Sequence, residues 1–146
     1  MIGILQYAAH TRRLQQKLYQ PLSEELGLSQ LEMELLLFLR NNPDRNTAHD
    51  AVTLRGFAKS NVSKAVEVLE RKGYIQVQPD ASSRRVKRLT LLPGRRQECD
   101  RIAQQQKRCF AAILEGFTED ERDALARYFA RMDGNVVRAL EALEDQ

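Results

Sequence analysis

Five polar or basic side chains fall within the six residues 59–64, which read Lys59, Ser60, Asn61, Ser63 and Lys64 around one valine. The amide of Asn61 both donates and accepts hydrogen bonds, a pairing that matches the edge of an adenine. A lysine ammonium can donate to guanine or hold a phosphate. Ser60 and Ser63 also have a purely structural interpretation, because serine is a common helix-capping residue. What the group does depends on the element that carries it.

A second basic group follows about twenty residues later and consists of Arg84, Arg85, Lys87 and Arg88. Two arginines at the tip of a turn could enter the minor groove of a duplex, where a narrow A·T tract deepens the negative potential. Neighbouring residues of a strand point to opposite faces. We therefore expect at most one of Lys87 and Arg88 to be well placed for the nucleic-acid backbone.

The charge of the chain is concentrated around these two groups. Residues 55–96 carry eleven Lys or Arg against three acidic residues, a net charge of +8, whereas the rest of the chain carries −5. A basic middle between acidic ends is typical of a protein that binds a polyanion. A solvated Lys/Arg face with no partner is the alternative that charge alone leaves open.

The first group lies on a predicted helix over residues 59–72, with Gly73 at its C-terminal end. Its apolar positions recur at helical spacing and form one stripe: Val62, Ala65, Val66 and Leu69. The polar side chains therefore face away from the core. After residue 73 the period changes from 3.6 to 2 over residues 74–78 and 86–91, and the polar residues 79–84 between them predict a hairpin turn.

Three further helices are predicted before this pair of elements. Residues 4–18 are amphipathic, Pro21 kinks or ends that helix, and Gly27 closes a short turn at residues 22–26. Ser29 and Glu32 form a capping box for a second helix that should stop near Asn41. Asn46 or Thr47 can cap a third, short helix through Leu54, after which Gly56 permits a tight turn.

The helical pattern returns at Pro93 and continues to the C-terminus. Thr118 and Glu121 form another capping box. An apolar stripe about five turns long follows, at Leu125, Phe129, Met132, Val136, Leu140 and Leu143. Such a stripe is too long for a core of this size to cover, so we interpret the two C-terminal helices and the first helix as an association surface. An intramolecular helical bundle is the alternative.

This order of elements resembles the MarR family of bacterial transcriptional regulators. The resemblance rests on residues 54–66 (LRGFAKSNVSKAV), residues 69–75 (LERKGYI), and the wing residues 85–91 (RVKRLTL) with Pro93. It implies a mainly α fold with a small β-wing, in which a winged helix-turn-helix lobe is flanked by N- and C-terminal dimerisation helices. The implied domains are a helical dimerisation region at 1–28 and 93–146 and a DNA-binding lobe at 29–92.

The sequence departs from the family pattern at three places. After the wing, Leu92 replaces a usual Thr, and the Gly that commonly follows is displaced to Gly94. The family wing usually contains Asp-x-Arg, in which the Asp braces the Arg; here Ser83 occupies the Asp position and Arg85 the Arg position, and Asp80 is the carboxylate nearby that could substitute. Ala58 stands where a Ser or Thr cap is common. Ser60 could cap instead, which would move the start of the recognition helix by two residues.

The resemblance implies a homodimer that binds double-stranded DNA at a near-palindromic operator, with recognition helices about 34 Å apart, and that acts as a repressor. It also implies release by a small aromatic or phenolic ligand in a cleft. Candidate lining residues for that cleft are Tyr7, His10, Arg13, Met33 and Phe38. A packed core at these positions and a constitutive binder without ligand are the alternatives.

Other functional classes find little support in the sequence. Glycine-rich phosphate loops and zinc-protease motifs are missing, and His10 and His49 lie far apart, so we expect no enzyme, no cofactor and no metal site. No apolar run approaches a membrane span or a signal peptide, which predicts a cytoplasmic protein with no membrane contact. Cys99 and Cys109 suit buried packing thiols, with a redox switch between subunits as the alternative. A winged helix that binds protein or RNA without specific DNA binding is the rival function.

Overall fold

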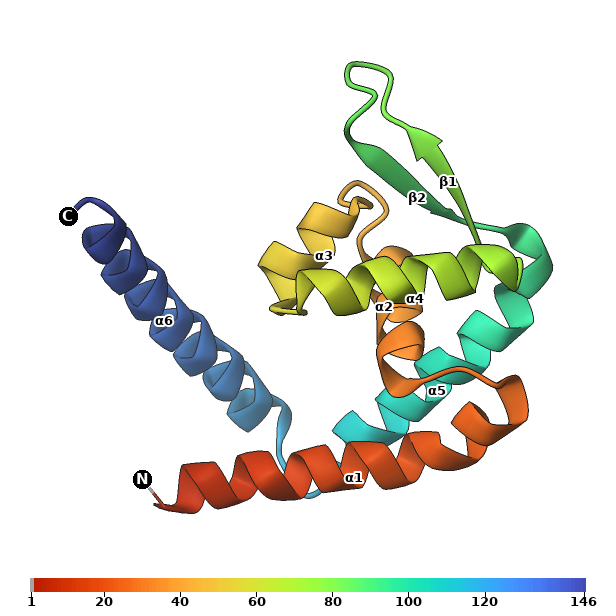
Figure 1. Cartoon of the computed structure of the whole chain (residues 1–146). Coiled ribbons are helices and arrows are strands. Elements are labelled where there is room, and N and C mark those ends of the chain that lie inside the picture. The colour runs from red at the N-terminus through yellow and green to blue at the C-terminus, as the bar shows by residue number, and fades with distance from the viewer. Residues whose placement is uncertain (1) are drawn as a thin grey trace. The chain divides into compact units, whose positions relative to one another are not determined.

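The computed structural model of the protein describes residues 2–146, with only the backbone of Ile2. The chain divides into two compact units, of which the first ends at Cys109 and the second is Phe110–Gln146. Figure 1 shows the elements, which follow the order α1 (Ile2–Leu26), α2 (Gln30–Asn41), α3 (Ala48–Arg55), α4 (Lys59–Arg71), β1 (Ile75–Pro79), β2 (Lys87–Leu91), a 3-10 turn (Pro93–Arg95), α5 (Arg96–Ile113) and α6 (Glu119–Glu144). The predicted fold class, mainly α with a two-stranded wing, is confirmed.

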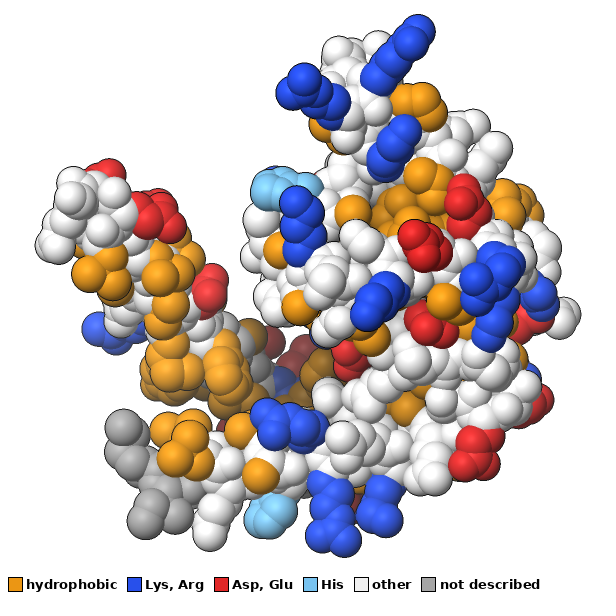
Figure 2. Space-filling model, in the orientation of Figure 1, with side chains coloured by type: hydrophobic (Ala, Val, Ile, Leu, Met, Phe, Trp, Pro, Cys, Tyr) orange, Lys and Arg blue, Asp and Glu red, His pale blue; other side chains and the backbone are white. Residues whose placement is uncertain are grey.

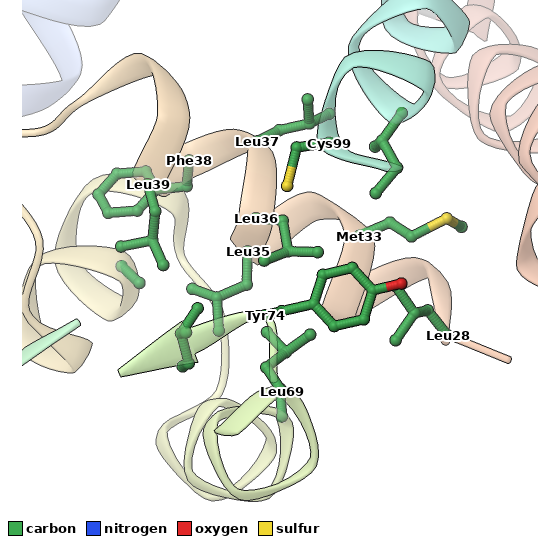
Figure 3. Packing of buried hydrophobic residues seen from close by; sticks show 14 of the residues in the cluster. Leu28, Met33, Leu35, Leu36, Leu37, Phe38, Leu39, Leu69, Tyr74 and Cys99 are labelled. Carbon is green, nitrogen blue, oxygen red and sulfur yellow. The ribbon is translucent and has the colours of Figure 1, made fainter. Parts of the chain in front are cut away.

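Helix α2 forms the centre of the first unit. Its apolar residues continue around the whole helix, and five consecutive side chains, Leu35 to Leu39, are at most 3 % exposed. A helix that is apolar on all sides is stable in water only when other elements surround it. Figure 3 shows α2 side chains between Leu69 of α4 and Cys99 of α5, with Tyr74 beside them. The core therefore packs helices that precede the wing in the sequence together with α5, which follows it.

Capping boxes start helices α2 and α3 as the sequence predicts. Ser29 Oγ accepts from the amide of Glu32 and the Glu32 carboxylate accepts from the amide of Ser29, both at 3.1 Å. The same reciprocal pair starts α3 at Thr47, so Thr47 rather than Asn46 is its cap. The backbone of Gly56 has φ 69°, a left-handed conformation that favours glycine, and it makes the turn between α3 and α4.

Of the two alternatives expected at Pro21, a kink or an end of the first helix, the end is wrong. Helix α1 continues through Pro21 to Leu26 as one element of 25 residues. A proline inside a helix removes one backbone hydrogen bond and costs about 3 kcal/mol. On either side of it, Tyr19 and Leu22 are each only 4 % exposed. Burial of these two side chains offsets the missing bond and holds the last turns in helical form.

The wing is an antiparallel hairpin of five residue pairs, from Ile75 opposite Leu91 to Pro79 opposite Lys87. Ile75 and Leu89 are buried, whereas the residues near the turn are exposed. Figure 1 shows the hairpin leaving the end of α4 and extending away from the helices, with its turn at the free end. The root of the wing thus belongs to the core and its tip does not.

The second unit consists mainly of α6, which starts at the predicted capping box of Thr118 and Glu121. The expected apolar stripe is present and little of it is covered. Phe129, Met132, Val136, Leu140 and Leu143 are 52–66 % exposed, and Figure 2 shows hydrophobic side chains along this helix. The second unit by itself does not bury the stripe.

Both cysteines lie on α5 and are buried, and neither is in a disulfide. Burial raises the pKa of the Cys99 thiol and of the Cys109 thiol above the usual range. A raised pKa lowers the fraction of reactive thiolate at neutral pH. These surroundings fit the packing interpretation of the two cysteines.

Over the described part of the chain, no helix combines the length and the apolar character needed to cross a membrane.

Candidate nucleic-acid interface

The predicted recognition helix is α4, and its two faces differ in burial. Val62, Ala65 and Leu69 are at most 3 % exposed and pack against the core. The five predicted site residues are all exposed: Lys59, Ser60, Asn61, Ser63 and Lys64. Over the described residues, none of these five side chains has a hydrogen-bond or ion-pair partner within the protein. Their donors and acceptors are therefore available to another molecule.

The start of α4 lies at Lys59, and the expected shift of two residues is wrong. Ala58 is the N-cap, with φ −68° and ψ 133°, and it makes no side-chain hydrogen bond to the helix. Ser60 lies inside the first turn and does not cap the helix. Because the serines of α4 are not used as caps, their hydroxyl groups remain free on the exposed face.

The uncapped start of α4 gives a stability prediction. Threonine at Ala58 should place a hydroxyl on the free amides and raise the free energy of unfolding by about 0.5–1 kcal/mol. That gain corresponds to a rise of about 1–4 °C in the melting temperature. Ala58→Val is the matched control, because valine has nearly the shape of threonine without the hydroxyl. Equal melting temperatures for the two variants, measured by circular dichroism, would show that no cap forms.

The tip of the wing carries two more of the predicted residues. Arg84 and Arg85 are exposed and follow a turn in which the Ser83 amide donates to the Asp80 carbonyl at 3.3 Å. Lys87, the first residue of β2, is exposed as well. Figure 2 shows Lys and Arg side chains at the free end of the wing and others over the helices below it. Both basic groups of the sequence thus belong to the first unit.

Arg88 differs from the other eight predicted residues because its guanidinium is already engaged. Its Nε donates to Asp80 Oδ1 at 2.9 Å and its Nη1 donates to Asn46 Oδ1 at 3.1 Å. Asp80 was the expected brace for Arg85, and the structure pairs it with Arg88 instead. Hydrogen bonds from Ser82 and from Arg88 lower the pKa of the Asp80 carboxyl to about 2, so it is ionised at neutral pH.

Sequence reasoning missed two positioning contacts around α4. Asn46 was considered only as a cap, and nothing local indicates its bond to Arg88, 42 residues away. Arg95 stacks on the ring of Tyr74, 4.7 Å from its centroid, and donates to the Lys72 carbonyl at 2.9 Å. The second contact ties the end of the recognition helix to the start of α5. Its only sequence signal was an arginine beside Pro93.

Two of the five residues proposed for the ligand cleft lie in the core. Met33 is 0 % and Phe38 3 % exposed, so both belong to the packed core, which was the alternative interpretation. Tyr7, His10 and Arg13 are exposed on α1. The first unit has an open cavity of about 340 Å³ elsewhere, between the end of α2, the end of the wing and the start of α5. Its lining residues are Arg40, Leu91, Leu92, Pro93, Arg96, Cys99 and Asp100.

Comparison with known proteins agrees with this architecture. Residues 26–86 match the model of the MarR family. No curated protein matches the chain by sequence. Many solved structures do match by shape. The transcriptional regulator PA3341 shares 25 % identity with a TM-score of 0.81, over 94 % of this chain and 99 % of that chain.

Two other solved structures bear on function through their own partners. A putative MarR-family regulator from Listeria monocytogenes, crystallised with a 26-mer DNA, is 20 % identical, with a TM-score of 0.78 over 95 % of this chain and 90 % of that chain. BpsR of Bordetella bronchiseptica, whose DNA binding is regulated by 6-hydroxynicotinic acid, is 20 % identical, with a TM-score of 0.68 over 90 % and 98 % of the two chains. Residues 26–86, about two fifths of the chain, are thus similar to the MarR family, and nearly the whole chain shares the fold of these solved structures.

Proposed function

We propose that the protein is a sequence-specific DNA-binding transcriptional regulator that represses transcription in the bacterial cytoplasm by binding a near-palindromic operator as a homodimer. The observation that carries this proposal is the exposed polar face of α4, Lys59 to Lys64, in the same compact unit as the exposed arginines of the wing tip. The structure of a family member with DNA supports the same use of the fold.

Dimensions and chemistry agree with insertion of α4 into the major groove. A helix about 10–12 Å across fits a groove about 12 Å wide. Asn61 would then hydrogen-bond to an adenine edge, and Lys64 would donate to a guanine edge or to a phosphate. The hydroxyl groups of the two serines would donate to nearby acceptors. Arg84 and Arg85 would reach the adjacent minor groove from the wing. Neutralising several phosphates in this way makes the affinity fall steeply with salt.

The homodimer is supported by apolar side chains that neither unit covers. The first unit exposes Ile4 at 68 % and Leu5 at 72 % near the start of α1. The second unit exposes the α6 stripe described above. Contiguous exposed apolar surface on a globular protein marks an association site. A symmetric dimer would present two copies of α4 to two half-sites, about one helical turn of DNA apart.

Selection from a random duplex library, followed by footprinting and measurement of the mass of the complex, tests this proposal. The expected result is an enriched inverted repeat bound by two protomers. The rival function, a winged helix that contacts protein or RNA, predicts no enriched duplex sequence. Equal binding of a duplex RNA of the recovered sequence would also favour the rival, because A-form RNA has a major groove too narrow for a helix.

We further propose that a small aromatic or phenolic ligand releases the protein from DNA. A cavity beside Pro93 has room for one, with the guanidinium of Arg96 for an acidic group and leucine side chains for a ring, whereas Arg40 is already paired there with Asp100 at 2.6 Å. Titration of the DNA complex with 6-hydroxynicotinic acid and with benzoate tests this. We expect the ligand to release DNA from the wild-type protein, and to release it from Arg96→Ala only at a higher ligand concentration. Equal sensitivity of the two proteins would place the ligand elsewhere.

A further inference from the structure

The root of the wing is attached to the segment that precedes α3. The amide of Leu89 in β2 donates to the Asn46 carbonyl at 2.8 Å, and Thr47 and Arg88 form an antiparallel bridge. The side chains repeat this connection, because Arg88 Nη1 donates to Asn46 Oδ1 at 3.1 Å. A backbone contact and a side-chain contact therefore join the same two segments, which lie about forty residues apart in the sequence.

Arg88 extends the connection across the hairpin to the other strand. Its Nε donates to Asp80 Oδ1 at 2.9 Å, and Asp80 directly follows β1. Asp80 Oδ2 in turn accepts from the amide of Ser82 in the turn at 3.2 Å. The Asp80 side chain is only 18 % exposed and that of Arg88 39 %. One guanidinium thus links the helix-turn-helix, β2 and the start of the wing turn.

The hairpin beyond this point is held by backbone hydrogen bonds, such as that from the Asp80 amide to the Val86 carbonyl at 2.8 Å, and gains little from packing. Leu89 is the last fully buried residue of β2, whereas Lys87 and Val86 are exposed. A two-stranded hairpin without packing is marginally stable in water. The direction of the wing tip, and with it the positions of Arg84 and Arg85, therefore depends on the contacts of Arg88.

We propose that Asp80, Arg88 and Asn46 form a clamp that sets the direction of the wing relative to α4, and that Arg88 is a positioning residue rather than a DNA contact. This inference rests on the proposed DNA binding. In the family pattern an Asp two residues before Arg85 would brace the wing, but Ser83 at that position has no carboxylate. The ion pair of Asp80 and Arg88 takes over this bracing role. Arg84 and Arg85 remain the side chains that reach DNA, and the clamp reduces the conformational entropy that they lose on binding.

Two substitutions separate a clamp from a phosphate contact, because the two roles predict opposite results. Asp80→Asn weakens the hold on Arg88 and removes a negative charge. If Arg88 binds phosphate, this variant binds DNA more tightly; if Arg88 is a clamp, it binds roughly tenfold more weakly, since the wing arginines must be ordered on binding. Arg88→Lys keeps the charge but loses the planar fork that reaches two acceptors. The clamp predicts a similar loss, and the phosphate contact predicts almost none.

Asp44→Asn is the matched control, because Asp44 is exposed in the loop before Asn46 and the substitution changes the charge equally. Affinities are measured on the selected duplex and on a duplex whose flanks beneath the wing are changed from A·T to G·C. The clamp variants should lose the preference for A·T flanks and keep discrimination in the half-site read by α4. A general loss of stability would reduce both, and affinities equal to that of Asp44→Asn would overturn the proposal.

Hydrogen exchange of the free protein tests the clamp independently of DNA. Asp80→Asn should speed exchange in residues 80–90 and leave α2 unchanged, because the core of the first unit does not depend on Asp80. Unchanged exchange in residues 80–90 would contradict the clamp. If the wild type shows no specific DNA binding but the wing exchange responds as expected, the clamp stands and the proposed function fails.

Discussion

Val136→Glu in α6 is expected to convert the dimer into monomers and to lower the affinity for the operator by at least about a hundredfold. Val136 is 56 % exposed in the chain and lies in the middle of the stripe that runs from Leu125 to Leu143. A dimer that covers the stripe buries this position, and a symmetric interface buries it twice. Burying an unpaired carboxylate costs several kcal/mol for each copy.

The loss of DNA affinity follows from the loss of the dimer. Two linked recognition helices bind two half-sites cooperatively, because the second binding event is intramolecular and gains about 10²–10⁴ in apparent affinity. A monomer retains only the contacts of one half-site. The helix itself should be unaffected, since glutamate has a higher helix propensity than valine.

The control for this prediction is Arg127→Glu. Arg127 precedes Val136 by nine residues, which at about 100° per residue places it on the opposite side of α6 from the stripe. Sedimentation at micromolar concentration should show a monomer for Val136→Glu and a dimer for the control, with equal helical content by circular dichroism. A Val136→Glu protein that remains dimeric would place the association surface elsewhere.

Replacing both wing-tip arginines by alanine should weaken operator binding about 10- to 100-fold and, because a dimer loses four arginines, reduce the slope of log affinity against log salt by up to about 4. Arg84 and Arg85 are exposed and take no part in the hydrogen bonds of the wing turn, which use Asp80, Ser82 and Ser83. The melting temperature should therefore stay the same. The loss should be larger for A·T-flanked than for G·C-flanked operators, because the narrow A·T minor groove attracts arginine most strongly.

Fluorescence anisotropy across a salt series measures both quantities. The control removes the same charge from the second unit, by Arg127→Ala and Arg131→Ala on the side of α6 away from the stripe. It should change affinity only through the net charge and should leave the flank preference intact. An Arg84→Ala, Arg85→Ala protein with the wild-type slope would show that the wing tip does not contact DNA.

Much of the fold was predictable because its signals are local. The capping boxes at Ser29 and Thr118 contain both of their partners within four residues, and the structure forms both. The stripe of α4 indicated which face would be buried, and Val62 and Leu69 are at most 1 % exposed. Such features are determined by neighbouring residues and helical geometry, so one sequence suffices to find them.

The features that sequence reasoning missed depend on contacts between distant segments. Pro21 is a helix breaker by its own chemistry, and only the burial of Tyr19 and Leu22 shows why α1 continues. The alternation of the strand places Arg88 and Lys87 on opposite faces, but it does not reveal that Arg88 binds Asn46, which lies before α3. Met33 and Phe38 looked available for a ligand because nothing local distinguishes a cleft from a core around α2.

The affinity of the purified protein for its own upstream region, compared with an unrelated duplex at several salt concentrations, tests the central claim most directly. The account predicts a site in the upstream region bound at least about a thousandfold more tightly than the unrelated duplex, with a steep salt dependence for both. Because α4 would read bases, the ratio of the two affinities should persist as salt rises. Equal and weak binding to both duplexes, with a ratio near one at every salt concentration, would contradict it.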